Sequence, residues 1–87
     1  MSEQEAIEQL KKEGFAHVYT WSDSPGAFYD KHEHPNVTAH IILKGSMTLT
    51  IEGIRKDCSE GDRIDVPANT EHLAQIGPNG CTYVNGE

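Results

Sequence analysis

The spacing of apolar residues changes from a helical period to a strand period near Gly14. Before this point the apolar positions form a narrow stripe at helical spacing: Ala6, Ile7 and Leu10. Ser2 and Glu5 form a capping box, in which each side chain satisfies a free backbone N–H group of the first turn. Gly14 stands where a left-handed C-terminal cap is expected. The pattern predicts a short helix over residues 3–13.

From residue 15 onward, apolar and polar residues alternate with a period of two, as in half-buried strands. Glycine and proline turn signals divide this part into about eight short strands. These are predicted over residues 15–21, 27–34, 38–44, 47–52, 54–58, 63–66, 71–76 and 81–84. Turns are predicted at Gly45 with Ser46 and at residues 77–80. The pattern indicates an all-β fold, a sandwich or small antiparallel barrel, lined by Met47, Leu49, Ile51, Ile64, Val66, Ala74 and Ile76.

The length of 87 residues suggests a single domain over residues 1–87, with the helix in residues 1–14 and the β-barrel in residues 15–87. The net charge of −7 disfavours contact with phosphate backbones and anionic lipid, and we therefore expect no nucleic-acid or membrane-surface partner. No apolar run approaches the roughly 20 residues of a membrane span, and the charged N-terminus lacks the apolar stretch of a signal peptide. We therefore expect a cytoplasmic protein. Cys58 and Cys81 are expected to be free thiols that pack as small apolar residues.

Three of the 5 histidines lie in two places that suit metal binding. His32 and His34 stand one residue apart on a predicted strand, so both side chains lie on one face, about 7 Å apart at the backbone. Two imidazoles in this position reach a common ion at about 2.0–2.1 Å. His72 lies far along the chain, at the head of another predicted strand. Taken alone, the pair also fits two solvated or hydrogen-bonded histidines, so both interpretations stay open at this point.

The spacing around these histidines resembles the two sequence motifs of the cupin superfamily. The first motif spans residues 26–45 as a glycine, five residues, His32, one residue, His34 and a closing glycine. The second spans residues 61–76 as a glycine, five residues, a proline and, five positions later, His72. The resemblance implies a jelly-roll-like antiparallel β-barrel with one divalent transition metal inside, held by the three motif histidines.

The sequence departs from the cupin pattern at three positions. Thr38 stands in place of a glutamate ligand, Asn69 in place of a glycine and Ile76 in place of an asparagine. Asparagine tolerates left-handed backbone better than other non-glycine residues, so the turn at Asn69 is expected to survive. Three neutral imidazoles leave a divalent ion its full charge, and the site is therefore expected to favour an anionic ligand. Fe, Mn, Ni, Zn and Cu all suit this donor set.

His40 lies two residues beyond Thr38 on the same predicted strand face. Three roles stay open for it: a fourth metal ligand, a base or hydrogen-bond partner for a substrate, or a barrel histidine bonded to Thr38 or water. If the protein is an enzyme, His40 is the candidate catalytic base.

Residues near the motif histidines suggest how the pocket is lined and how the outer surface is covered. Phe28 and Asp30 share the predicted face of His32, where they line the pocket or serve packing and a turn, whereas Tyr29 should point outward. A second apolar face is predicted on the strands that carry Tyr19, Trp21, Ile41 and Leu43. Since a short chain has little else to cover such a face, we expect a homodimer.

Three functions follow from the resemblance. The first is a metal-dependent enzyme, similar to a dioxygenase or isomerase, that acts on a small anionic or chelating organic molecule. The alternative is a non-catalytic cupin that binds a metal or a small ligand. The third is a structural remnant that folds as a cupin and binds nothing tightly. The absent glutamate and the short chain favour the second function over the first.

Overall fold

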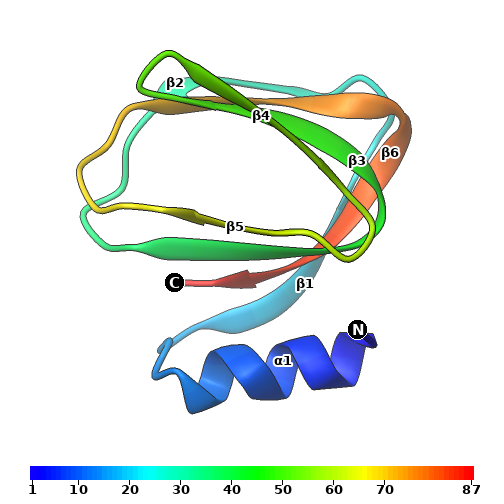
Figure 1. Cartoon of the computed structure of the whole chain (residues 1–87), viewed down its shortest axis with the longest axis vertical. Coiled ribbons are helices and arrows are strands. Elements are labelled where there is room, and N and C mark those ends of the chain that lie inside the picture. Colours follow the sequence, from blue (N-terminus) through cyan, green and yellow to red (C-terminus); the bar gives the residue numbers. More distant parts are fainter.

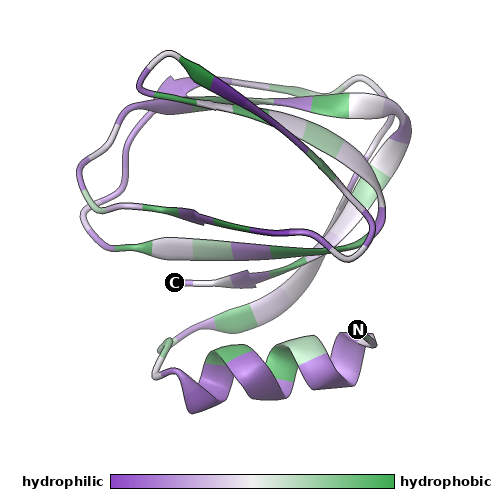
Figure 2. Cartoon of the chain, viewed as in Figure 1, coloured by the Kyte–Doolittle hydropathy of each residue, from purple (hydrophilic) through white to green (hydrophobic).

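Helix α1 (Glu3–Lys12) begins at the capping box that the sequence predicts, in a computed structural model that describes all of residues 1–87. The Ser2 hydroxyl accepts a bond from the Glu5 backbone N–H (3.1 Å), and the Glu5 carboxylate accepts one from the Ser2 N–H (3.1 Å). Ala6 and Leu10 are completely buried. Figure 2 shows the hydrophobic side of the helix turned toward the strands. At ten residues, the helix is too short to span a bilayer, and the chain holds no other helix.

Six antiparallel strands follow the helix and form one sheet that folds over into two layers (Figure 1). They are β1 (Val18–Asp23), β2 (Phe28–His32), β3 (Thr38–Ile51), β4 (Ile54–Ser59), β5 (Arg63–Val66) and β6 (His72–Gly86). One layer contains β2, the first part of β6, the second part of β3, and β4. The other contains β5, the first part of β3, the second part of β6, and β1. The all-β prediction with a short helix is confirmed, but the barrel is not closed.

The two long strands β3 and β6 run through both layers, and this corrects the predicted turns at Gly45 and at residues 77–80. Gly45 has φ +80° and pairs with Cys81, and a Cβ atom on it would lie 2.1 Å from the Gly80 carbonyl oxygen. The glycines therefore permit a shared bend with close backbone contact, and pairing resumes beyond it. A sequence pattern that ends a strand at a glycine cannot distinguish such a bend from a turn.

The inner core lies between the two layers. It contains all of the residues that the sequence places inside the barrel: Met47, Leu49, Ile51, Ile64, Val66, Ala74 and Ile76. Cys58 and Cys81 belong to the same cluster as free thiols, which confirms their interpretation as small core residues. Burial raises the pKa of the Cys81 thiol to about 11, so this thiol is protonated and unreactive near neutral pH.

A second buried cluster lies between α1 and the outer face of the sheet. Its members are Ala6, Leu10, Ala39, Ile41 and Val84, with Leu43 and Val18 packed against it. Helix α1 therefore covers the face of Ile41 and Leu43, which the sequence pattern predicts to be covered by a second subunit. The helix is also tied to β5, since the Arg63 guanidinium donates to both carboxylate oxygens of Glu13 (2.6 and 2.7 Å).

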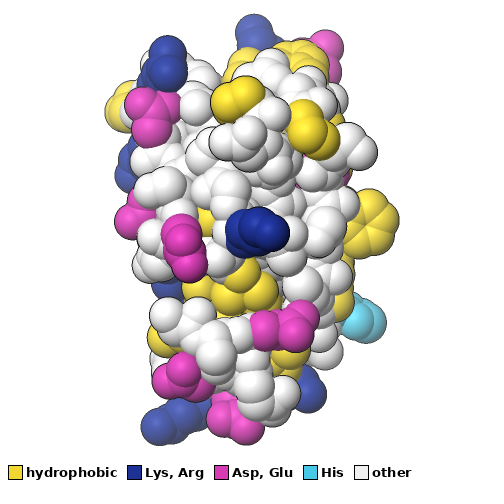
Figure 3. Space-filling model, turned by 90° about the vertical axis from the view of Figure 1, so that its right-hand side faces the viewer, with side chains coloured by type: hydrophobic (Ala, Val, Ile, Leu, Met, Phe, Trp, Pro, Cys, Tyr) yellow, Lys and Arg dark blue, Asp and Glu magenta, His cyan; other side chains and the backbone are white.

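Tyr19 and Trp21 do not share the outer face with Ile41, which is a second correction. Along β1 the even-numbered residues face the helix: Val18 packs on the outer cluster, and Thr20 donates to Glu3 (2.5 Å). Tyr19 and Trp21 lie on the opposite face and line the cavity between the layers. On the face shown in Figure 3, charged side chains of both signs are scattered, and hydrophobic atoms emerge in separate places. The homodimer stays a prediction.

Candidate metal centre

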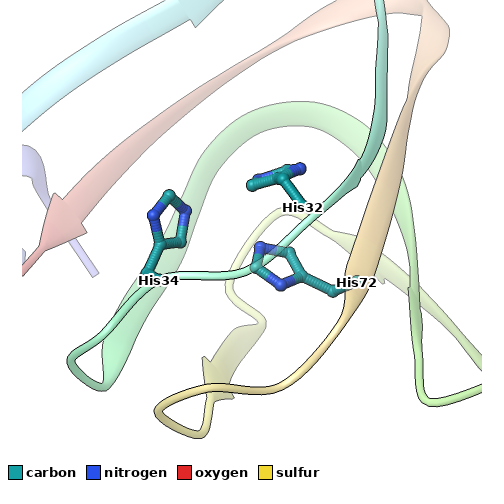
Figure 4. A group of neighbouring side chains, drawn as sticks. All are labelled: His32, His34 and His72. Atoms are coloured by element: carbon teal, nitrogen blue, oxygen red, sulfur yellow. The ribbon is translucent and has the colours of Figure 1, made fainter.

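Three histidines from separate parts of the chain come together at one end of the two long strands (Figure 4). His32 is the last residue of β2, His34 lies in the loop that follows, and His72 is the first residue of β6. Each offers a ring nitrogen, and these atoms all lie within 4.8 Å of one another. The ring centroids of His32 and His72 are 4.2 Å apart, and the other two pairs are 5.0 and 5.3 Å apart. The structure thus brings together the residues that the sequence motifs single out.

Backbone carbonyl groups orient two of the three rings. The Nδ1 atom of His32 lies 2.7 Å from the Asp30 carbonyl oxygen, and that of His72 lies 2.9 Å from the Thr70 carbonyl oxygen. Because a carbonyl oxygen can only accept, Nδ1 carries the hydrogen in both rings, and Nε2 keeps a free lone pair. This arrangement is common among metal-binding histidines, whose other ring nitrogen usually donates to a carbonyl or carboxylate.

Strand register and one left-handed residue bring the histidines together. His32 pairs directly with His72 between β2 and β6. His34 is held from the loop before β6, where the Asn69 backbone N–H donates to its carbonyl oxygen (2.7 Å). Asn69 has φ 55°, the left-handed conformation that the motif glycine would adopt. The expectation that asparagine preserves this turn is confirmed.

The environment of His72 keeps its imidazole neutral. The residue is only 4% exposed, and burial is the main effect that lowers its pKa. The neighbouring His32 and His34 lower the pKa further, while the bond to the Thr70 carbonyl opposes the shift. A neutral imidazole with Nδ1–H bonded to a carbonyl presents its Nε2 lone pair to the cluster, as metal coordination requires.

A cavity of about 550 Å³ opens next to the three histidines. Its apolar wall consists of Met47, Leu49, Ala74 and Ile76. The rest of the lining includes tyrosine and tryptophan side chains together with Thr38, His40 and Asn85. Glu87 is the one acidic residue in the lining, which includes no lysine or arginine. The pocket is therefore large enough for a small organic molecule and places it against the imidazoles.

His40 lines this cavity but lies outside the three-histidine group. Its Nδ1 atom is 2.5 Å from Oδ1 of Asn85, and its Nε2 atom is 3.4 Å from the Thr38 hydroxyl. Since an amide oxygen only accepts, Nδ1 carries the hydrogen, and Nε2 accepts from Thr38. Burial is the largest effect that lowers the pKa of His40, which is therefore neutral at pH 7. The bond to Thr38 agrees with one of the three roles left open, and catalysis by His40 stays a prediction.

Tyr29 and Phe28 exchange the positions that the sequence suggests for them. Tyr29 lines the cavity, whereas Phe28 is 55% exposed and lies outside the lining. The cause is an irregularity in β2: Tyr29 pairs with Ala74 and His32 pairs with His72, so three steps on β2 match two on β6. One extra residue reverses the alternation, and Tyr29 joins the face of His32. Asp30 contributes its backbone carbonyl to His32, and its carboxylate bonds to the Lys31 N–H instead of lining the pocket.

Asp23 organises a group of aromatic residues that sequence analysis missed. Its Oδ1 atom accepts from the Trp21 indole N–H (3.0 Å) and from the Tyr29 hydroxyl, and its Oδ2 atom accepts from the Tyr83 hydroxyl (2.5 Å). Burial and then the Asp23 carboxylate raise the pKa of Tyr83 far above its ordinary value. Asn85, which orients His40 from the directly opposite position on β6, was also missed. The sequence holds no signal for either, because both depend on pairing between distant strands.

Comparison with known proteins agrees with this fold. Residues 19–76 match the family described as the Cupin domain, and the chain belongs to the cupin family. The dimethylsulfoniopropionate lyase DddW of Ruegeria pomeroyi is 29% identical over 62 residues, which cover 71% of this chain and 41% of that protein. The chain thus spans less than half the length of this curated relative.

Two solved structures illustrate the likeness in fold. An RmlC-like cupin from Shewanella frigidimarina superposes with a TM-score of 0.71 at 22% identity, over 78% of this chain and 60% of that one. The DMSP lyase DddQ from Ruegeria pomeroyi has the same TM-score and identity, over 78% of this chain and 35% of that one. At this identity the likeness concerns the fold alone.

Proposed function

We propose that this cupin holds one divalent transition metal with His32, His34 and His72 and acts on a small anionic or chelating organic molecule. The observation that carries the proposal is the convergence of three ring nitrogens within 4.8 Å at the wall of a cavity of about 550 Å³. The donor set fits such a metal, because the bonds from Nδ1 to carbonyl oxygens leave two Nε2 lone pairs free. Ligands around one tetrahedral ion lie about 3.4 Å apart, so the rings need to close by about 1 Å.

A metal bound there would supply Lewis-acid charge and open positions for an anionic oxygen of the substrate. The chain itself contributes the surroundings. Met47, Leu49 and Ile76 exclude water from one wall of the cavity. His40, neutral and fixed by Asn85, presents an Nε2 lone pair that can accept a proton from a substrate in place of the Thr38 hydroxyl.

Proton transfer is the chemistry that these residues support best. A base positioned beside a substrate carboxylate or carbonyl can remove an adjacent proton, which begins both isomerisation and elimination. Two relatives are named as lyases of dimethylsulfoniopropionate, so this compound belongs in the first panel of substrates. Dioxygenation, the other activity that the motif resemblance permits, would in addition consume oxygen.

Metal content and turnover test the proposal in turn. Elemental analysis of untagged protein should give about one metal ion per chain, and the His72→Ala variant should lose it. Metal-loaded protein is then incubated with small carboxylates, keto acids, diketones and dimethylsulfoniopropionate, with oxygen uptake recorded. The enzymatic function is supported if a substrate is turned over and if the His40→Gln variant lowers this turnover without changing the metal content. If the purified protein contained no stoichiometric metal, the proposed metal site would be contradicted, and with it the proposed function.

A non-catalytic binding protein is the second candidate, and one observation favours it. Thr38 is buried where the family has a glutamate, so the site lacks the carboxylate ligand. Stoichiometric metal together with ligand binding but no turnover would favour this function.

A further inference from the structure

A second group of residues in the cavity lining differs in chemistry from the histidines. It consists of four aromatic side chains: Tyr19, Trp21, Tyr29 and Tyr83. They come from β1, β2 and β6, and they range from buried (Tyr83, 7% exposed) to the rim of the opening (Trp21, 51% exposed). We infer that these rings form a subsite for the methylated cationic group of a small zwitterion, whose anionic group is held at the histidine cluster. The anionic half of this inference rests on the proposed function.

The polar atoms of the four rings are already bonded to carboxylates. Asp23, which is not part of the cavity lining, accepts bonds from the Trp21 N–H and from the Tyr29 and Tyr83 hydroxyls. The Tyr19 hydroxyl donates to a Glu87 carboxylate oxygen at 3.4 Å. The carbon surfaces of the rings are thus what remains to contact a ligand. Aromatic carbon surfaces attract cations through the ring quadrupole, most strongly when little water is present.

The charges around the rings favour a cation over an anion or a neutral group. Asp23 stands behind three of the rings, and Glu87 lies beside the fourth. No lysine or arginine lines the cavity. At the histidine cluster the charge is opposite, because a divalent ion held by neutral imidazoles keeps its 2+ charge. A molecule with one group of each sign therefore complements the whole cavity.

The hydrogen bonds at Asp23 distinguish a methylated cation from a primary ammonium group. An ammonium group needs hydrogen-bond acceptors for its three N–H groups. Asp23 lies outside the lining and already accepts three bonds, from Trp21, Tyr29 and Tyr83. Glu87 is the one carboxylate in the lining, and it accepts from the Tyr19 hydroxyl. A quaternary ammonium or tertiary sulfonium group has no N–H to satisfy, and aromatic sites are the usual way in which proteins bind such groups. The chemical class is accordingly a small carboxylate that carries a methylated onium group.

Trp21, the single tryptophan of the chain, provides a direct probe of this subsite. Metal-free protein is titrated with tetramethylammonium chloride, with sodium chloride at equal ionic strength as the control. We expect a saturable change in tryptophan fluorescence with tetramethylammonium only. This experiment does not need the metal, so its failure is distinct from a failure of the histidine site. Identical fluorescence responses to the two salts would overturn the inference. So would a dimer that buries Trp21 and leaves it inaccessible to both salts.

A matched pair of ligands tests the cation in the metal-loaded protein. Trimethylglycine and 3,3-dimethylbutanoate have the same shape and carboxylate, but only the first carries a positive charge. Calorimetric titration should show about tenfold tighter binding of trimethylglycine. Trp21→Leu and Asp23→Asn should each bring this ratio toward one, and Phe28→Leu, which changes an exposed aromatic residue outside the cavity, should leave it unchanged. Equal affinities in the unaltered protein, or a ratio insensitive to Trp21→Leu, would refute the subsite. Trp21 is half exposed, so this variant is expected to fold even if Asp23→Asn does not.

Discussion

The outer and inner faces of the β1–β6–β3 layer differ in character although the same strands form both. On the outer face, Ala39, Ile41 and Val84 pack against α1 with no ionisable group among them. On the inner face, the residues beside them in sequence, His40, Tyr83 and Asn85, line the cavity. Residues that pack against the helix and residues that line the cavity therefore stand next to each other in sequence, because strand alternation turns them to opposite faces.

The largest expected effect comes from removing one histidine of the inner side. His72→Ala should lower the affinity for a divalent metal by more than about 100-fold, because even the loss of an outer hydrogen-bond partner of a ligand costs 10–100-fold. The loss of this buried, hydrogen-bonded side chain should also lower the unfolding free energy of the metal-free protein. Metal should no longer raise the melting temperature of the variant, so its loss of stability should be larger in the presence of metal. Calorimetry and thermal melts with and without metal measure both effects.

His17→Ala is the matched control, since His17 is exposed and lies outside the cavity lining. It should leave both quantities unchanged. An equal loss of stability in metal-free and metal-loaded His72→Ala would mean that His72 is structural, and the contrast between the two faces would fail.

The outer side is tested by Leu10→Ala in the helix. Leu10 is completely buried, so the cavity left behind should lower the unfolding free energy by about 3 kcal/mol. Metal affinity should stay within about twofold, because the helix packs on the outer face of the β1–β6–β3 layer, whereas His32 and His72 belong to the other layer. Denaturant unfolding and metal titration check the two parts, with the exposed Lys11→Ala as control. A large fall in metal affinity would show that the faces are coupled.

Alkaline pH should weaken the inner core. The folded state raises the pKa of Cys81 from 9.0 to about 11, because burial disfavours the thiolate. Between these values the unfolded chain releases a proton that the folded protein retains, so stability should fall as pH rises from about 9 to 11, by roughly 2 kcal/mol at most. Unfolding measured across this range should be less pH-dependent in Cys81→Ala. An unchanged slope would assign the effect to other groups.

The smallest effect is expected at the end of the helix. Arg63 holds the pKa of the Glu13 carboxyl at about 2, below its ordinary 4.5. A lowered pKa in the folded state stabilises the fold above about pH 4.5, and this contribution disappears as pH falls toward 2. Glu13→Gln should therefore lower the melting temperature slightly at pH 7 and hardly at all near pH 2. Glu8→Gln, on the same helix without an arginine partner, is the control.

The sequence predicts much of the fold because local chemistry and alternation decide it. The capping box at Ser2 and Glu5 is local, and the strand from Met47 to Ile51 shows its inner face through a period of two. The motif spacing indicates that His32, His34 and His72 belong to one site. These features depend on neighbours along the chain or on a resemblance. The structure contains the cap and the strand face and brings the three histidine rings together, and metal binding by them stays a prediction.

The sequence does not reveal features that arise from contacts between strands. Gly45 bends a continuous strand because it packs against Gly80, a residue far away in sequence. The extra residue between Tyr29 and His32 becomes visible only against the register of β6. Asp23 lies between the predicted strands 15–21 and 27–34, and its three aromatic partners come from different strands. Composition and periodicity carry no information about such pairings.

The placement of His34 has a consequence for how fast an ion exchanges. His32 and His72 are fixed on paired strands and clamped through their own ring nitrogens, whereas His34 stands on a loop held by one backbone bond from Asn69. Since two of the donors stand on paired strands and the third on a loop, release of an ion should begin with detachment of His34. We therefore expect the lifetime of the bound ion to depend on the stiffness of that loop more than on the strength of the two fixed donors.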